Sequence, residues 1–381
     1  MTGNTVQGVT SWLFGLLFRR PRTVPSRLRL PWLAGLLAYL VFAAALTLVA
    51  LAKARVTLPP VLADPVVTGT AAALAAVFGI VATRWLAPVA GDAARYLSAT
   101  PDNVAARQKI RDAGVDLLEK LQSSGRYDRI IVLGHSLGSV VAFDVLNCAW
   151  GRMKPQVLQA SHSEGSPALA ALIALEEAAG ALTHANTDDD QAKAQSAYRS
   201  AQRDYAAALR NIPNSPWLVS DFVTVGSPLS KADVLLAYDE QALEQKKQRR
   251  EAPTSPPVFE VDKPGVDGGV YRFSFPADAE VRIPHHAAVF APVVWTNIYF
   301  PSFAIVFGDM ISGECAPQLG RGIRDIKLRI GGPVFRHLDY WKGAEHTPLP
   351  DRITALRKAV NLRLQSEDQL WPAPRNVVEG R

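Results

Sequence analysis

The chain has 381 residues, of which 48% are hydrophobic and 20% charged, a composition that excludes an intrinsically disordered protein. Its formal net charge is +6, but residues 1–64 carry seven basic residues against one acidic residue, and residues 65–381 are balanced. A local basic flank is not a nucleic-acid-binding groove, so we expect no nucleic-acid partner. Two cysteines, Cys148 and Cys315, exclude a disulfide framework, and without a Cys/His cluster of metal-ligand spacing we expect neither a metal nor a cofactor.

Two uncharged stretches dominate the N-terminal part. Residues 31–52 form a run of 22 residues without a charge, which as a helix is about 33 Å long and can cross a bilayer core. A second run of 19 residues, 65–83, is richer in alanine and glycine and is expected to insert by packing on the first. We therefore predict a transmembrane hairpin within residues 31–88. A cleaved signal peptide, or a buried apolar helix in a soluble core, is the alternative.

Basic residues flank the first stretch unequally. Five arginines precede Trp32, whereas the loop between the two stretches carries only Lys53 and Arg55. By the positive-inside tendency, residues 1–30 form a cytoplasmic basic segment, and a second crossing returns the chain to the cytoplasm. The predicted location is the inner or plasma membrane, with two crossings and a cytoplasmic body.

Residues 90–381 have the composition of a soluble domain. A helix is predicted from residue 100 to the Ser123-Ser124-Gly125 stop, followed by a short, apolar, β-branched strand and a second helix at 139–150. Strands with wide gaps between them are expected at 129–133, 218–225, 293–300 and 325–330. Gaps of this size leave room for helical crossovers, so the sequence predicts an α/β fold with a mainly parallel sheet and helices on both faces.

Three further segments interrupt or decorate this alternation. A helical insertion at about 160–212 contains two alanine-rich helices, at 166–182 and 191–209. Its apolar residues either form a lid or interfacial dock or pack on the body; they are Leu169, Leu172, Ile173 and Leu182. Residues 241–257 are polar and basic and predict a solvated helix end that runs into a mobile loop. A hairpin is expected between 258–261 and 271–275.

The segment Gly134-His135-Ser136-Leu137-Gly138 fits Gly-x-Ser-x-Gly. The bare pattern is weak, since a chain of this length shows it by chance on the order of one time in ten. Here it lies between a predicted strand and a predicted helix, where the turn strains Ser136 and exposes its oxygen. This context favours a nucleophile over an ordinary serine in a glycine-rich turn. The backbone N–H of Leu137, at the helix N-terminus, is the expected oxyanion donor.

A nucleophilic serine needs a general base, and the base needs an orienting acid. In a strand–turn–helix hydrolase the chain order is serine, acid, histidine, which selects His337, after the fourth strand, with His346 as the alternative. Asp309, in a glycine-containing loop after the third strand, is the candidate acid, and Asp325 and Asp339 are expected to be structural.

The remaining histidines are interpreted as structural. His135 is expected to point away from the site within the turn, and His162 and His184 lie in or beside the inserted helices. His285 and His286 precede the third strand, which is the wrong place for the base, and are expected to pack or to cap.

Four segments together resemble the α/β-hydrolase superfamily, most closely its lipase-like branch and a membrane-anchored, bacterial-type member of it. They are GHSLGS, the TVGSPL turn at 224–229, WTNIYFP with the following GDMISG, and His337-x-x-Tyr-Trp. The resemblance covers about residues 91–345. It implies an esterase or lipase that forms an acyl-enzyme on Ser136, with His337 as general base and then acid and Asp309 holding the imidazole.

The chain departs from that superfamily before the nucleophile strand. Members normally have further strands there, and a loop, often His-Gly, that donates the second oxyanion N–H. No convincing strand precedes Arg129, so the second donor is unassigned and one sheet edge is expected to be open. Residues 55–58, a partner chain, or sequence upstream of this start could cover that edge, and an uncovered edge favours a homo-oligomer or another partner.

The sequence thus predicts a membrane-anchored serine hydrolase that cleaves carboxylic esters. Lipid acyl esters are favoured over other small esters because a site held at the bilayer meets acyl chains at high effective concentration. A serine peptidase or thioesterase with the same three residues is one alternative. A non-catalytic membrane-bound interaction module that retains the fold is the other. Nothing in the sequence identifies the natural substrate.

Overall fold

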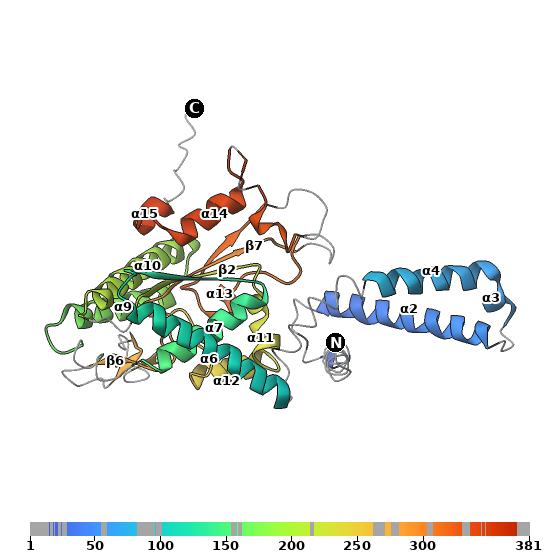
Figure 1. Cartoon of the computed structure of the whole chain (residues 1–381), viewed down its shortest axis with the longest axis horizontal. Coiled ribbons are helices and arrows are strands. Elements are labelled where there is room, and N and C mark those ends of the chain that lie inside the picture. Colours follow the sequence, from blue (N-terminus) through green and yellow to red (C-terminus); the bar gives the residue numbers. More distant parts are fainter. Residues whose placement is uncertain are drawn as a thin grey trace. The chain divides into compact units, whose positions relative to one another are not determined.

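The computed structural model describes residues 29–54, 59–81, 101–153, 162–213, 217–261, 271–275, 282–302, 308–329 and 336–371 except 344 and 347, with single residues at 15, 18, 20, 21, 24, 96 and 158. The chain divides into two compact units, Met1–Gln108 and Lys109–Arg381, and the division falls inside helix α6 (Pro101–Ser123). The two units are shown in Figure 1.

The first unit contains a helical hairpin. Helix α2 (Arg29–Lys53) packs beside α4 (Pro65–Val81), with the short helix α3 (Pro60–Ala63) between them (Figure 1). Both long helices therefore lie within two residues of the predicted bounds. Within the part of the chain that the structure describes, none of the helices meets the length and hydropathy needed to span a membrane. The helices are thus confirmed, and the membrane crossing stays a prediction.

The second unit is built on a four-stranded sheet in which all neighbouring strands run parallel. The strand order is β1 (Ile130–His135), β2 (Val219–Val225), β7 (Val294–Tyr299) and β8 (Arg324–Lys327). This confirms the predicted α/β fold and the four predicted strand positions. In the register, His135 lies opposite Val225, and Val225 opposite Ile298. Because parallel strands end at the same edge, the loops that follow β1, β2 and β7 meet there.

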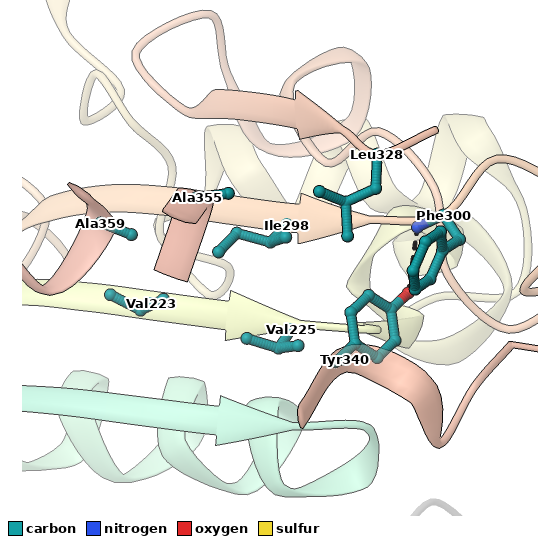
Figure 2. Packing of buried hydrophobic residues seen from close by; sticks show 8 residues of the cluster. All are labelled: Val223, Val225, Ile298, Phe300, Leu328, Tyr340, Ala355 and Ala359. Atoms are coloured by element: carbon teal, nitrogen blue, oxygen red, sulfur yellow. Dashed lines mark hydrogen bonds between the residues drawn. The ribbon is translucent and has the colours of Figure 1, made fainter. Parts of the chain in front are cut away.

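Helices cover both faces of the sheet. Helix α7 (Leu137–Gly151) places Phe143 against Trp295 on one face, with ring centroids 5.7 Å apart. Successive strand residues point to opposite faces, so Val223 faces the other way from Phe222. There it packs under α14 (Asp351–Val360), in a cluster shown in Figure 2 and made of Val223, Val225, Ile298, Phe300, Leu328, Tyr340, Ala355 and Ala359.

The helical insertion consists of α9 (Pro167–His184) and α10 (Asp188–Arg210), which pack on each other. Leu169, Leu172 and Leu182 are buried, and only Ile173 is partly exposed, at 37%. The apolar face of α9 is therefore mostly packed in the interior, as the packing alternative predicts, and the lid or interfacial dock stays an untested alternative. A buried carboxylate anchors α9 at Glu176, which accepts hydrogen bonds from the backbone N–H of Phe273 and the Ser274 hydroxyl, at 2.9 and 2.7 Å.

Two small antiparallel pairs lie outside the main sheet. Strand β3 (Glu260–Val261) pairs with β4 (Tyr271–Arg272), which confirms the predicted hairpin, although its turn lies outside the described residues. Strand β5 (Ser274–Phe275) pairs instead with β6 (Ile283–Pro284). The short helical elements are η4 (Pro228–Lys231), α11 (Ala232–Leu235), α12 (Glu240–Gln248), α13 (Ala316–Leu319), η5 (Asp339–Trp341) and α15 (Glu367–Leu370).

The segment after α12 differs from its prediction as a mobile loop. Thr254 and Ser255 are buried. The backbone N–H of Ser255 donates to the carbonyl of Leu319 at 2.8 Å, and its carbonyl accepts from Gly322 N–H at 2.7 Å. The polar composition of 241–257 did not predict this, because the backbone groups of the segment are satisfied by a loop more than sixty residues further along the chain.

Strand β1, which leads to Ser136, lies at an edge of the sheet. In the described part of the chain it pairs only with β2. Leu133 is 40% exposed, whereas every residue of β2 is buried. The predicted open edge is therefore present among the described residues, and residues 55–58, one of the covers that the sequence offers, lie outside them.

Candidate active site

The nucleophile candidate, Ser136, is the single residue between β1 and α7. Strand β1 ends at His135 and α7 begins at Leu137, so Ser136 is the N-cap residue, with φ 53° and ψ −131°. A positive φ is strained for a serine and is found where the surrounding structure enforces it. Here the Ser136 N–H donates to the carbonyl of Val225 at 3.0 Å, which ties the turn to the neighbouring strand. This is the strained turn that the motif predicts.

The two glycines of the motif have different roles. A Cβ added to Gly134 would lie 2.5 Å from Cα of Ser139, which is backbone of the first turn of α7. A Cβ added to Gly138 would meet nothing within 4 Å. The close approach of strand and helix therefore requires the first glycine, while the second is not required by packing within the described residues.

His337 bridges Ser136 and Asp309. Its Nε2 lies 2.7 Å from Oγ of Ser136, and its Nδ1 lies 2.9 Å from Oδ2 of Asp309. His337 and Asp309 are both buried. An ionised carboxylate only accepts hydrogen bonds, so Nδ1 carries the proton and the lone pair of Nε2 faces the serine hydroxyl. The structure thus brings together the three residues selected from the sequence, from positions up to 201 residues apart.

Asp309 is held as an anion by its hydrogen bonds. Burial by itself raises the pKa of this carboxyl, but the bonds from His337, from the Tyr340 hydroxyl and from the Ile311 N–H outweigh burial and lower the pKa below its ordinary value. A buried anion beside His337 favours the imidazolium that forms when the ring accepts a proton.

Tyr340 is a site residue that sequence reasoning missed. Its buried hydroxyl donates to Oδ2 of Asp309 at 2.7 Å and accepts from the Phe300 N–H at 3.1 Å, the bond drawn in Figure 2. Its ring belongs to the hydrophobic cluster under α14, so the cluster positions the acid. Gly226, with φ 59°, makes room, because a Cβ there would lie 2.7 Å from Cε2 of Tyr340. The spacing His337-x-x-Tyr340 was the available signal.

The alternative base and acids lie elsewhere. The His346 side chain is 65% exposed, and its Nδ1 lies 3.9 Å from Oε1 of Glu345. Asp325 accepts the N–H groups of Cys315 and Ala316 at 2.9 Å each, at the start of α13. Asp339 forms ion pairs with Arg336 and Lys342. All three are placed as structural or surface residues.

Two further histidines have the structural roles expected for them. His162 is buried between the carbonyl of Leu158 and the hydroxyl of Tyr205, at 2.8 and 2.9 Å. His285 lies 2.9 Å from the carbonyl of Val258, and burial lowers its pKa to about 4, so it is neutral near pH 7.

His135 does not point away from the site, and that expectation is wrong. Its Nε2 lies 3.0 Å from the backbone carbonyl of His337, and the two imidazole rings are stacked with centroids 5.2 Å apart and 28° between their planes. The alternation of strand residues says which face His135 occupies, but only the fold brings the His337 loop onto that face.

The structure places one of the two backbone N–H groups expected to bind the oxyanion. Leu137 is the first residue of α7, and the first N–H groups of a helix have no intrahelical acceptor, so its N–H is available at the turn. The loop expected to supply the second donor precedes β1. Because residues 82–100 lie outside the described part except for Tyr96, the second donor stays unassigned.

Apolar side chains are exposed next to His337. Leu338 is 65% exposed and Trp341 41%. The Trp341 ring lies 5.8 Å from the ring of His135, which places this surface at the site.

Among the described residues, no group of three or more His, Cys, Asp or Glu side chains could hold a metal ion.

Comparison with known proteins identifies no relative. No family model matches the chain, and neither a curated protein nor a solved structure matches it. The parallel α/β sheet with flanking helices is consistent with an α/β-hydrolase but is not specific to one. Any functional conclusion therefore depends on the geometry of the site.

Proposed function

We propose that the protein is a serine hydrolase that cleaves carboxylic esters through an acyl-enzyme on Ser136. The observation that carries the proposal is the continuous hydrogen-bonded series from Ser136 Oγ through His337 to Asp309, with contacts of 2.7 and 2.9 Å, at a strained turn between a strand and a helix. Serine hydrolases on unrelated folds share this geometry, so the arrangement supports the activity more strongly than the fold does.

The proposed reaction has two halves. His337 takes the proton of Ser136 as Oγ attacks the ester carbonyl, and the Leu137 N–H donates to the oxyanion that forms. The tetrahedral intermediate collapses, the alcohol leaves with the proton from His337, and the acyl group stays on Ser136. Water then attacks the acyl-enzyme, with His337 again taking and returning the proton, and releases the carboxylic acid. Asp309 remains ionised and orients the ring throughout.

An apolar acyl group is the favoured substrate. The exposed side chains of Leu338 and Trp341 beside His337 favour an apolar partner over a charged one, because contact would remove apolar surface from water. A serine peptidase or thioesterase would use the same three residues and is distinguished by its substrate.

The enzyme is tested by labelling with a fluorophosphonate probe in native membranes. Wild type is expected to label, Ser136→Ala is not, and Ser124→Ala, at an exposed serine before β1, is expected to label like wild type. Absence of Ser136-dependent labelling would favour the non-catalytic interaction module and refute the proposed activity.

The substrate class is tested on p-nitrophenyl esters of increasing acyl length, set beside thioester and peptide substrates. We expect ester turnover to rise with chain length and Leu338→Ser to reduce it selectively for long chains. Leu362→Ser, at a residue that is 79% exposed outside the site, should change neither. Faster turnover of peptides or thioesters would replace the ester assignment by one of the two alternatives.

Membrane attachment through the hairpin is part of the proposal. It is supported by the 22 uncharged residues at 31–52 and by the exposure of Leu37 and Leu40 on α2, 64% and 52%. An arginine at the centre of a membrane helix costs about 3 kcal/mol, so Leu37→Arg with Leu40→Arg should release the chain from carbonate-washed membranes. A double variant that still pellets would show that the attachment lies elsewhere.

A cytoplasmic orientation of the body is proposed from the arginines before Trp32.

The open edge of β1 supports a proposal of association with a second copy or another chain. Unpaired N–H and C=O groups at a sheet edge favour pairing with a further strand. Chemical cross-linking of detergent-solubilised wild type is expected to trap an oligomer, and Leu133→Lys to weaken it. A monomer at all protein concentrations would refute self-association.

A further inference from the structure

The residue immediately before the candidate nucleophile contacts the candidate base. His135 ends β1, and its Nε2 lies 3.0 Å from the backbone carbonyl of His337. Its ring also stacks on the His337 ring at 5.2 Å. Ser136 meets His337 at Nε2, so two adjacent residues of one turn hold the same histidine at its backbone and at its reacting nitrogen.

The hydrogen bond defines the tautomer of His135. A backbone carbonyl only accepts, so Nε2 of His135 must carry a proton and donate it to His337. Burial lowers the pKa of His135, the bond to the His337 carbonyl raises it, the His337 ring lowers it and Asp309 raises it, and the net shift is downward. The lowered pKa favours the uncharged ring, in which the proton is on Nε2 and Nδ1 carries none.

The charge of the His135 ring affects the candidate base because the two rings are stacked. His337 and Asp309 are the charged or titratable groups that act on it, and the rings of Tyr340 and Trp341 lie edge-on at 5.9 and 5.8 Å. During the proposed reaction His337 becomes an imidazolium. A second positive charge on the stacked ring would oppose it, because like charges at this separation disfavour ionisation.

We infer that His135 is a positioning residue that clamps the backbone of His337 to the nucleophile turn and keeps an uncharged ring against the base. The inference rests on the proposed function and adds a residue to it. His135 touches no reacting atom in this role. It acts through His337. It holds Nε2 of His337 at hydrogen-bonding distance from Ser136 Oγ, and because its own ring is uncharged it does not repel the imidazolium that forms on His337.

The matched variants are His135→Leu, His135→Gln and the control His346→Leu, each in the full chain in detergent. Leucine removes the donor, whereas the glutamine amide can donate an N–H from a position close to that of Nε2. Small misplacements of a catalytic group cost up to about 100-fold in rate. We expect His135→Leu to lower kcat for p-nitrophenyl butyrate by about 10- to 100-fold with KM within about twofold. We expect His135→Gln to recover to within a few-fold of wild type, and His346→Leu to match it.

The acid limb of kcat/KM supplies a readout that a purely structural role would not change. In wild type, protonation of His135 should place a positive charge against the base and reduce activity, which makes the acid limb steeper. His135→Gln has no imidazole at this position, so its acid limb should be less steep than that of wild type. Identical limbs in wild type and His135→Gln would overturn the electrostatic part of the inference.

A measurement without turnover separates this inference from the proposed function. The Nδ1 proton of His337, bound to Asp309, should give a far-downfield proton NMR signal in wild type and in His346→Leu, and a shifted or broadened one in His135→Leu. A wild type that shows the signal but neither labels nor hydrolyses esters would refute the proposed function alone. An unchanged signal with unchanged kcat in His135→Leu would refute the positioning role. Equal loss of activity and melting temperature in the leucine and glutamine variants would do so as well.

Discussion

The hydroxyl of Tyr340 connects the hydrophobic core to the acid of the candidate site, and Tyr340→Phe removes only that oxygen. The change deletes the 2.7 Å bond to Asp309 and the 3.1 Å contact with the Ser312 hydroxyl, and it leaves the buried N–H of Phe300 without its 3.1 Å acceptor. A hydrogen bond to a charged group contributes about 1.5–3 kcal/mol, and an orphaned buried donor costs about 1–3 kcal/mol. Because these losses share one oxygen atom and are not additive, we expect the free energy of unfolding to fall by about 3 kcal/mol.

The pH dependence of this loss follows from the lowered pKa of Asp309. A carboxyl whose pKa is lowered by folding stabilises the protein above its unfolded pKa of about 3.9, and that contribution disappears as the pH falls through the folded-state value. Tyr340→Phe raises the folded-state pKa toward the ordinary value. The difference between variant and wild type should therefore be constant from pH 7 to pH 5 and become smaller below about pH 4.

Urea denaturation of the full chain in detergent measures this, at pH 7, 5 and 3, together with fluorophosphonate labelling. A change of about 3 kcal/mol corresponds to roughly 6–12 °C in melting temperature for a domain of this size. Tyr127→Phe, at a tyrosine that is 45% exposed, is the control and should change stability by less than about 0.5 kcal/mol. A Tyr340→Phe variant with the wild-type denaturation midpoint at pH 7 would show that the bond to Asp309 does not support the fold.

Two further predictions concern the nucleophile turn and a buried histidine. Gly134→Ala places a Cβ 2.5 Å from backbone, so it should lower the free energy of unfolding by about 1–3 kcal/mol and abolish most of the probe labelling. The Cβ of Gly138→Ala would meet no described atom within 4 Å, so this variant should keep the stability and the labelling of wild type. Equal behaviour of the two variants would contradict the close strand–helix contact. Burial lowers the pKa of His285 to about 4, so the unfolded chain binds more protons than the folded chain between about pH 6.5 and pH 4. As the pH falls from 6.5 to 4, this histidine alone should lower the free energy of unfolding by about 3 kcal/mol, as measured by urea denaturation. His285→Gln should make the free energy of unfolding less dependent on pH in this range, and equal pH dependence in variant and wild type would show that His285 is not the group responsible.

Local patterns in the sequence were sufficient to predict the elements that carry the nucleophile. The β-branched run before Gly134 and the apolar helix after Ser136 are short-range signals, and a strand followed at once by a helix leaves one geometry for the residue between them. The parallel sheet followed from the wide spacing of the four strands. The helices of the insertion were predicted for the same reason, but not the burial of their apolar face, because periodicity shows that a face is apolar and not what covers it.

Only the tertiary structure decided which polar residues meet. His337 and Ser136 are 201 residues apart, and their contact depends on the parallel register that brings the ends of β1, β2 and β7 to one edge of the sheet. The same register places His135 under the His337 loop, which corrected the expectation for that residue, and brings Tyr340 to Asp309. Chain order narrowed the candidates for acid and base, but a hydrogen bond requires atoms within about 3 Å, and positions within that range depend on the packing of the whole sheet.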